Sequence, residues 1–295
     1  MNTKEIRIAL LDMNNNHPNQ GMKNITDLVK AFKKTSKEEV QIDEFNVRYS
    51  CSVPKVKDYD IFISSGGPGT PHREGFIWEE KYTQFLENLW EYNLENEDKK
   101  YAFLICHSFQ LAVIHWNLAT VNTRKSYSFG VMPIHKTEEG KDEYLFKNLA
   151  DPFWAIDSRA YQCVQPNDDQ LNEMGMKIVA LEKLRPHIDL ERAVMAIRFS
   201  NEIFGTQFHP EADSQGFLEN LKDENNKQTM IKNYGLHKYK ETVDRIDDED
   251  KIVKTQAQII PRFLAEAFQK ITDYRKDLEK SDEMKVKTKR LKIKL

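Results

Sequence analysis

The sequence predicts an α/β protein in which a mostly parallel β-sheet carries helices on both faces. Two observations favour this class. Short apolar runs, typical of buried strands, alternate with amphipathic segments, typical of helices, between Ile6 and Trp116. Polar or glycine-rich loops follow these runs directly, as in sheets whose ligands bind beyond the carboxyl ends of parallel strands.

The first part of the chain alternates between the two patterns. Strands are predicted at residues 6–11, 41–47, 59–63 and 101–105. Helices are predicted at residues 22–34, at residues 76–93 and after Cys106. Because the carboxyl ends of parallel strands meet at one edge, the loops that follow them should surround one crevice. These loops comprise residues 12–21, 64–75, 106–109 and 209–213.

The second part of the chain has a different pattern of apolar and polar residues. Residues 119–166 predict short strands and turns, residues 176–181 and 193–199 predict paired strands, and residues 203–208 predict the last strand. From about Gly216 the pattern is charged and helical. One apolar stripe predicts that the last long helix packs on the core, and it consists of Ile259, Ile260, Phe263, Leu264 and Phe268. We therefore expect an α/β domain at residues 1–215 and a helical C-terminal extension at residues 216–295.

Composition narrows the class of protein. The net charge of −3 gives no electrostatic reason to bind nucleic acid. No apolar run approaches the ~20 residues that cross a bilayer, and the N-terminus lacks a signal-peptide pattern. Three cysteines are no disulfide framework, so we expect a cytoplasmic protein with reduced thiols and no membrane contact. For the basic stretch at residues 285–295 we expect a solvated tail, the alternative being an anionic partner or a membrane surface.

One cysteine has the sequence context of a nucleophile. Cys106 lies between an apolar run and a helix, where backbone N–H groups and the helix dipole favour a thiolate. His209 ends another apolar run, and Glu211 lies two residues further on, so both side chains point the same way in an extended segment. Pro210 disfavours helix at His209 and helps to hold that geometry. The pattern indicates a thiol, its base and a carboxylate that orients the base.

Acyl transfer also requires N–H donors for the developing oxyanion. The glycine-rich stretch at residues 66–69 and the backbone N–H of His107 are candidates. The sequence contains neither a phosphate-binding loop nor a dinucleotide fingerprint, and Cys51 and Cys163 lack metal-ligand spacing. We therefore expect no cofactor, no bound nucleotide and no metal.

Three stretches resemble the signatures of a known family, the class I glutamine amidotransferases. They are residues 65–69, 105–110 and 205–211, within a likeness that spans residues 5–213. The resemblance implies a flavodoxin-like α/β fold with a Cys-His-Glu triad. It also implies site roles for six residues: Cys106 as nucleophile, His209 as base, Glu211 as its partner, Gly67 and His107 as oxyanion-hole amides, and Gln110 on the substrate side.

The chain departs from the family pattern at two places. The family elbow reads Gly-x-Cys-x-Gly, whereas Leu104 and Ser108 stand here in place of the glycines, which suggests a wider gap between strand and helix. The family's Ser-His pair for glutamine binding has no full counterpart. Ser158 is present without the histidine, and Arg159 is a candidate to grip a substrate carboxylate bidentately.

The leading interpretation is a glutamine amidotransferase-type cysteine hydrolase that releases ammonia from glutamine or a γ-glutamyl amide through a thioester. Either a partner synthase subunit accepts the ammonia or the chain is a free-standing hydrolase, and a homo-oligomer is compatible with both. Two alternatives stay open at this point. The first is a homoserine O-acyltransferase of the same fold, and the second is a non-catalytic binding or regulatory homologue.

Overall fold

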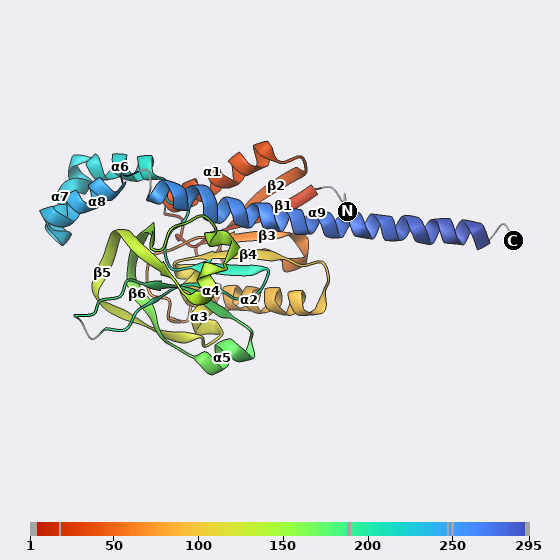
Figure 1. The fold of residues 1–295 in the computed structure, drawn as a ribbon, viewed down its shortest axis with the longest axis horizontal. Helices are drawn as coiled ribbons and strands as arrows, with labels where there is room; N and C mark the ends of the chain where they lie inside the picture. Colours follow the sequence, from red (N-terminus) through yellow and green to blue (C-terminus); the bar gives the residue numbers. More distant parts are fainter. Residues whose placement is uncertain (1–4, 18, 188–189, 247, 249–250, 293–295) are drawn as a thin grey trace.

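The computed structural model describes residues 5–17, 19–187, 190–246, 248 and 251–292, without the side chains of residues 220 and 282–292. A nine-stranded mixed sheet runs through the centre of the described chain, in the order β2-β1-β3-β4-β9-β8-β7-β5-β6. Helices lie on both faces of this sheet (Figure 1). The α/β class predicted from the sequence is therefore confirmed.

One half of the sheet is parallel. It contains β2 (Glu39–Asn46), β1 (Glu5–Asp12), β3 (Ile61–Ser64), β4 (Tyr101–Ile105) and β9 (Ile203–Thr206). In the register of β4 with β9, Leu104 lies opposite Gly205 and Ile105 opposite Thr206. The segments that follow these two strands, with Cys106 and His209, therefore leave the sheet at the same edge.

The other half is antiparallel. It contains β8 (Val194–Arg198), β7 (Lys177–Glu182), β5 (Ala119–Lys136) and β6 (Phe153–Pro166). The paired strands predicted near residues 176–181 and 193–199 are confirmed as β7 and β8. The prediction of short strands and turns at residues 119–166 was wrong in part, because β5 and β6 are long. A register shift between Thr123 and Ser128 interrupts their pairing, and exposed side chains there hide the alternation.

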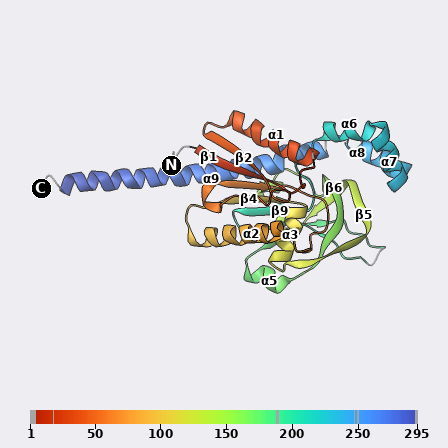
Figure 2. The ribbon, with the colours of Figure 1, turned by 180° about the vertical axis from the view of Figure 1, so that it is seen from behind.

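Two helical layers bury the faces of the sheet. On one face lie α1 (Gln20–Thr35) and α9 (Ile252–Lys292), whose apolar side chains join one core cluster. On the other face lie α2 (Ile77–Glu95), α3 (His107–His115) and the short α5 (Asp168–Glu173), whose side chains join a second cluster (Figure 2). The short helix α4 (Glu138–Lys141) contacts β7, and two 3-10 turns lie at Val56–Asp58 and Tyr144–Phe146.

The described chain after β9 is helical. The helices α6 (Ser214–Lys222), α7 (Glu224–Tyr234) and α8 (Leu236–Ile246) pack with β5 and β6 around a third cluster, which includes Val131, Ile156 and Met230.

Helix α9 packs its predicted apolar stripe into the core and then projects past the sheet (Figure 1). The side chains of the basic stretch at residues 285–295 lie outside the described part. No helix in the described part has both the length and the apolar character to cross a membrane.

Candidate active site

A strained turn presents Cys106 at the carboxyl end of β4. Cys106 has φ 50° and ψ −96°, a conformation that non-glycine residues rarely adopt. Its N–H donates to the Thr206 carbonyl at 2.7 Å, and its own carbonyl accepts from the Gln110 N–H at 2.9 Å. These two bonds fix the turn between strand and helix, so the thiol stands over the sheet edge, as a nucleophile requires.

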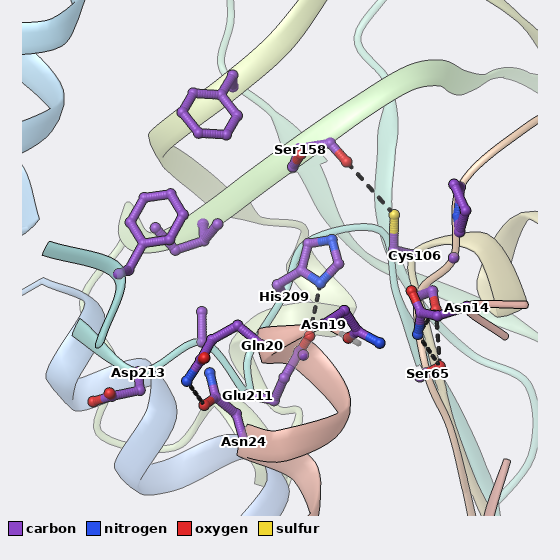
Figure 3. Close-up of a pocket in the computed structure, with 18 of the residues that line it drawn as sticks. Asn14, Asn19, Gln20, Asn24, Ser65, Cys106, Ser158, His209, Glu211 and Asp213 are labelled. Carbon is purple, nitrogen blue, oxygen red and sulfur yellow. Dashed lines mark hydrogen bonds and ion pairs between the residues drawn. The ribbon is translucent and has the colours of Figure 1, made fainter. Parts of the chain in front are cut away.

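The imidazole of His209 lies between Cys106 and Glu211 (Figure 3). Its Nδ1 is 2.7 Å from Glu211 Oε1, and the Glu211 side chain is buried. A Cβ built on Gly66 would lie 2.8 Å from His209 Cε1 and 3.4 Å from Cys106 Cβ, so both side chains border the same glycine. The structure therefore brings together the three residues that the sequence suggested as a triad.

Electrostatics favour a protonated imidazole. Burial by itself would lower the pKa of His209, but the Glu211 carboxylate and the Cys106 thiol, both by charge and by hydrogen bonding, raise that pKa well above 6.5. A histidine that keeps its proton beside a thiol can stabilise the thiolate and later deliver the proton to a leaving group.

The glycine-rich loop after β3 is held rigidly beside the thiol. Asn14 Nδ2 donates to the Gly66 carbonyl at 3.2 Å, and the Arg48 guanidinium donates to the Pro68 carbonyl. A Cβ on Gly67 would lie only 2.4 Å from the Met13 carbonyl oxygen, so a larger residue cannot take its place without a shift. Both Gly66 and Gly67 line the cavity next to Cys106.

The side chain of His107 is not placed for acid–base chemistry. It is buried, and burial together with the Arg48 charge lowers its pKa to about 3, so the ring is neutral. Its backbone N–H belongs to the first turn of α3, where N–H groups lack partners within the helix. The predicted contribution of His107, and that of Gly67, is a backbone amide rather than a side chain.

A chain of hydroxyl groups supports the elbow where the family pattern has a glycine. Tyr82 Oη donates to Ser64 Oγ at 2.9 Å, Ser64 Oγ and Ser108 Oγ are 2.7 Å apart, and Ser108 Oγ donates to the Ser65 carbonyl at 2.7 Å. All four groups are buried. Ser108 therefore joins α3 to the strand end that leads into the glycine loop.

The second departure, Leu104, is accommodated in the core. Leu104 is fully buried in the cluster that contains Phe109 and Phe199. Its register partner is Gly205, where a Cβ would lie 2.8 Å from Phe199 and 2.9 Å from Phe109. The missing side chain at Gly205 leaves room for these two rings beside Leu104.

Gln110 reaches the thiol only indirectly. Its Nε2 donates to Gln207 Oε1 at 2.9 Å, and Gln207 Nε2 lies 3.6 Å from Cys106 Sγ. Gln110 is buried and is not among the residues that line the cavity. Sequence reasoning missed Gln207, although its place two residues before His209, within the third signature stretch, was a usable signal.

The side chains of Ser158 and Arg159 point in opposite directions, because consecutive strand residues face opposite sides of a sheet. Ser158 lines the cavity, and its carbonyl lies 3.8 Å from Cys106 Sγ. Arg159 is buried elsewhere, with Nε 3.0 Å from Asp157 and Nη2 3.6 Å from Glu182. The structure thus does not place Arg159 where the sequence-based interpretation needs it, since both partners already occupy its guanidinium.

The triad opens into a cavity of about 610 Å³. One side of it is polar and comes from the loop after β1 and the first turns of α1, with Asn14, His17, Asn19, Gln20 and Asn24. The other side is mostly apolar and comes from β5, β6 and α6, with Tyr127, Phe129, Ile156 and Phe217. The sequence had indicated the polar loop but not this apolar side. No cluster of three or more potential metal ligands occurs among the described residues.

The match to a protein family covers most of the chain. The model of glutamine amidotransferase class-I matches residues 19–226, a stretch that contains Cys106, His209 and Glu211. The chain belongs to the class I glutamine amidotransferase family. A search of curated proteins finds no match.

Solved structures share the fold at low sequence identity. A glutamine amidotransferase from Thermotoga maritima has a TM-score of 0.62 at 13% identity, over 89% of this chain and 97% of that one. A glutamine amidotransferase from Methylobacillus flagellatus has a TM-score of 0.55 at 11% identity, over 92% and 94%. The glutaminase domain of Trypanosoma brucei CTPS, solved with bound acivicin, has a TM-score of 0.51 at 15% identity, over 70% and 86%.

Proposed function

We propose that the chain is a glutamine amidotransferase-type cysteine hydrolase that releases ammonia from glutamine, or an amine from a γ-glutamyl amide. The observation that carries the proposal is the arrangement of Cys106 on a strained turn beside a His209 that Glu211 holds at 2.7 Å. Family membership and a cavity at the sheet edge add support.

The reaction follows from the roles of these groups. The Cys106 sulfur attacks the γ-carbonyl carbon, and backbone amides near Gly67 and His107 receive the developing oxyanion. His209 gives its proton to the leaving nitrogen as the C–N bond breaks, which leaves a γ-glutamyl thioester on the sulfur. His209 then takes a proton from water, which attacks the thioester and releases glutamate.

The strained turn and the buried Glu211 both serve this cycle. The turn holds the sulfur close to His209 without a rearrangement at the moment of reaction. Glu211 fixes the ring through Nδ1, so that Nε2 is the nitrogen that exchanges protons with thiol, leaving group and water. We further propose that the catalytic machinery lies within residues 1–215; a synthase subunit that consumes the ammonia stays a prediction.

Glutamate release from L-glutamine and from a panel of γ-glutamyl amides tests the proposal. We expect turnover by the wild-type chain and loss of all measurable turnover in Cys106→Ala. Leu94→Ala is a suitable control, because Leu94 is exposed on α2 and does not line the cavity. Unchanged turnover in Cys106→Ala would refute the assignment. Release of free CoA from an acyl-CoA in the presence of homoserine, without glutamate release, would favour an acyltransferase instead.

A further inference from the structure

The glycine-rich loop after β3 contains a backbone N–H whose direction depends on a neighbouring carbonyl. Gly67 lines the cavity next to Cys106, and in the described part of the chain its N–H donates to no backbone carbonyl. The peptide bond between Gly66 and Gly67 is planar and trans, so the Gly67 N–H points opposite to the Gly66 carbonyl. The contacts of that carbonyl therefore decide where the N–H points.

Two buried side chains hold the Gly66 carbonyl. Asn14 Nδ2 donates to it at 3.2 Å, and Ser65 Oγ donates to it at 2.8 Å. Asn14 and Ser65 lie side by side close to Cys106, with Asn14 Nδ2 3.4 Å from Ser65 Oγ (Figure 3). Because both donors take the carbonyl, the N–H of Gly67 points away from these two side chains.

The side-chain amide of Asn14 is itself fixed by a carboxylate. Asp12 Oδ1 accepts from the backbone N–H of Asn14 and from Asn14 Nδ2, both at 2.8 Å. Turned the other way, the amide would set its own oxygen against the Asp12 carboxylate and the Gly66 carbonyl, neither of which can donate. A bond to a carboxylate also polarises the amide and strengthens the bond that its second hydrogen makes to the loop.

This arrangement goes beyond what the turn after β1 requires. The backbone N–H of Asn14 already closes that turn on Asp12. The side chain instead reaches a carbonyl 52 positions further along the sequence, in the loop that borders the thiol. A side chain that serves only its own turn would make no such contact.

We infer that Asn14 is a positioning residue: by holding the Gly66 carbonyl, it aims the Gly67 N–H at the oxygen of the carbonyl that Cys106 attacks. The inference rests on the proposed function, because an oxyanion forms only if the sulfur adds to a carbonyl. As the S–C bond forms, the π electron pair of the carbonyl moves to its oxygen, which accepts from the Gly67 N–H. The pair returns as the C–N bond breaks and the leaving nitrogen takes the proton of His209.

Two reactions of Cys106 test the inference in Asn14→Ala. Hydrolysis of the γ-glutamyl substrate passes through an oxyanion in both the attack of the sulfur and the attack of water. Alkylation by iodoacetamide displaces iodide from a saturated carbon and forms no oxyanion. Loss of an oxyanion-hole donor costs about 10²–10³ in kcat, so we expect misdirection of one donor to lower kcat by at least about tenfold. KM and the alkylation rate should each stay within about twofold of wild type, since neither depends on oxyanion stabilisation.

Two further variants complete the experiment. Ser65→Ala removes the other donor to the Gly66 carbonyl, and it should also lower kcat more than the alkylation rate. It keeps the inference testable if Asn14→Ala does not fold. Asn172→Ala is a matched control, because Asn172 is exposed on α5 and does not line the cavity, and it should keep kcat, KM and the alkylation rate.

The possible outcomes separate the inference from the proposed function. Wild-type kcat in Asn14→Ala would overturn the inference and leave the proposed function standing. Equal losses of kcat and alkylation rate, or a raised KM with unchanged kcat, would also overturn it, because Asn14 would then shape the nucleophile or bind substrate. Absence of glutamate release by the wild-type chain from every γ-glutamyl compound would refute the proposed function, and the inference with it.

Discussion

Ser108 offers a sharp test of how this elbow is held. In Ser108→Ala, the buried Ser64 hydroxyl loses its acceptor and the Ser65 carbonyl loses its donor, two bonds of 2.7 Å each. A net contribution of about 1 kcal/mol per neutral hydrogen bond predicts that the free energy of unfolding falls by about 2 kcal/mol. For Ser108→Gly the free energy of unfolding should fall by about 3 kcal/mol, since glycine inside a helix is less favourable than alanine by roughly 1 kcal/mol.

Tyr82→Phe measures the outer bond of the same chain. Burial raises the pKa of Tyr82 to about 12, so its hydroxyl is protonated and donates at neutral pH. Removing it leaves both Ser108 bonds intact, and we expect a loss of about 1 kcal/mol. The double variant with Ser108→Ala should lose less than the sum, because the groups belong to one network.

Equilibrium urea unfolding, followed by fluorescence, measures these differences. Ser281→Ala is a matched control, because Ser281 is exposed on α9 and its replacement should change stability by less than about 0.5 kcal/mol. Because Ser108 ties α3 to the glycine loop, kcat should also fall by about tenfold, equivalent to about 1.4 kcal/mol at the transition state. If Ser108→Ala and Ser108→Gly unfold at the same urea concentration as the wild type, the hydroxyl chain does not support the elbow.

Three further changes address the site. Glu211→Gln removes the carboxylate that raises the pKa of His209, so the stabilisation that is fully present below about pH 6.5, and is lost as pH rises through the folded-state pKa, should disappear. Urea unfolding at several pH values should then show that the free energy of unfolding of the variant falls furthest below that of the wild type near pH 6, and less at alkaline pH. A difference that does not depend on pH would contradict the pairing. Gly66→Ala places a Cβ 2.8 Å from the His209 ring, and glutamate release should fall by about 10² while the circular dichroism spectrum stays native; wild-type turnover would show that the loop tolerates a side chain there. Arg159→Met leaves the buried Asp157 without its ion pair and should lower the free energy of unfolding by about 3–5 kcal/mol. A stable variant with a raised KM would instead restore Arg159 as a substrate ligand.

Sequence patterns predicted the parallel half of the fold well because it is buried on both sides. The apolar runs at residues 6–11 and 101–105 correspond to β1 and β4, whose side chains meet helices above and below. Strands β5 and β6 were not recognised as long, because part of their length is exposed and no continuous apolar run marks it. Burial on one face only, with an irregular register, leaves a weak signal in the sequence.

The residues of the candidate site were also predictable only in part. Cys106, His209 and Glu211 were predictable because each follows a buried strand. The ion pair of Arg159 with Glu182 was not predictable, because Glu182 lies on another strand and comes close to Arg159 only in the folded sheet. The hydroxyl chain through Ser108 likewise depends on Tyr82, which a different helix supplies.

The apolar side of the cavity and the triad come largely from different parts of the chain, and this separation has a consequence for how such a protein can diversify. Substitutions on α6, such as at Phe217, would change the shape of the cavity, while the sulfur, the imidazole and Glu211, which lie outside that helix, kept their positions. The shape of the cavity can therefore change through a surface helix that carries none of the triad residues.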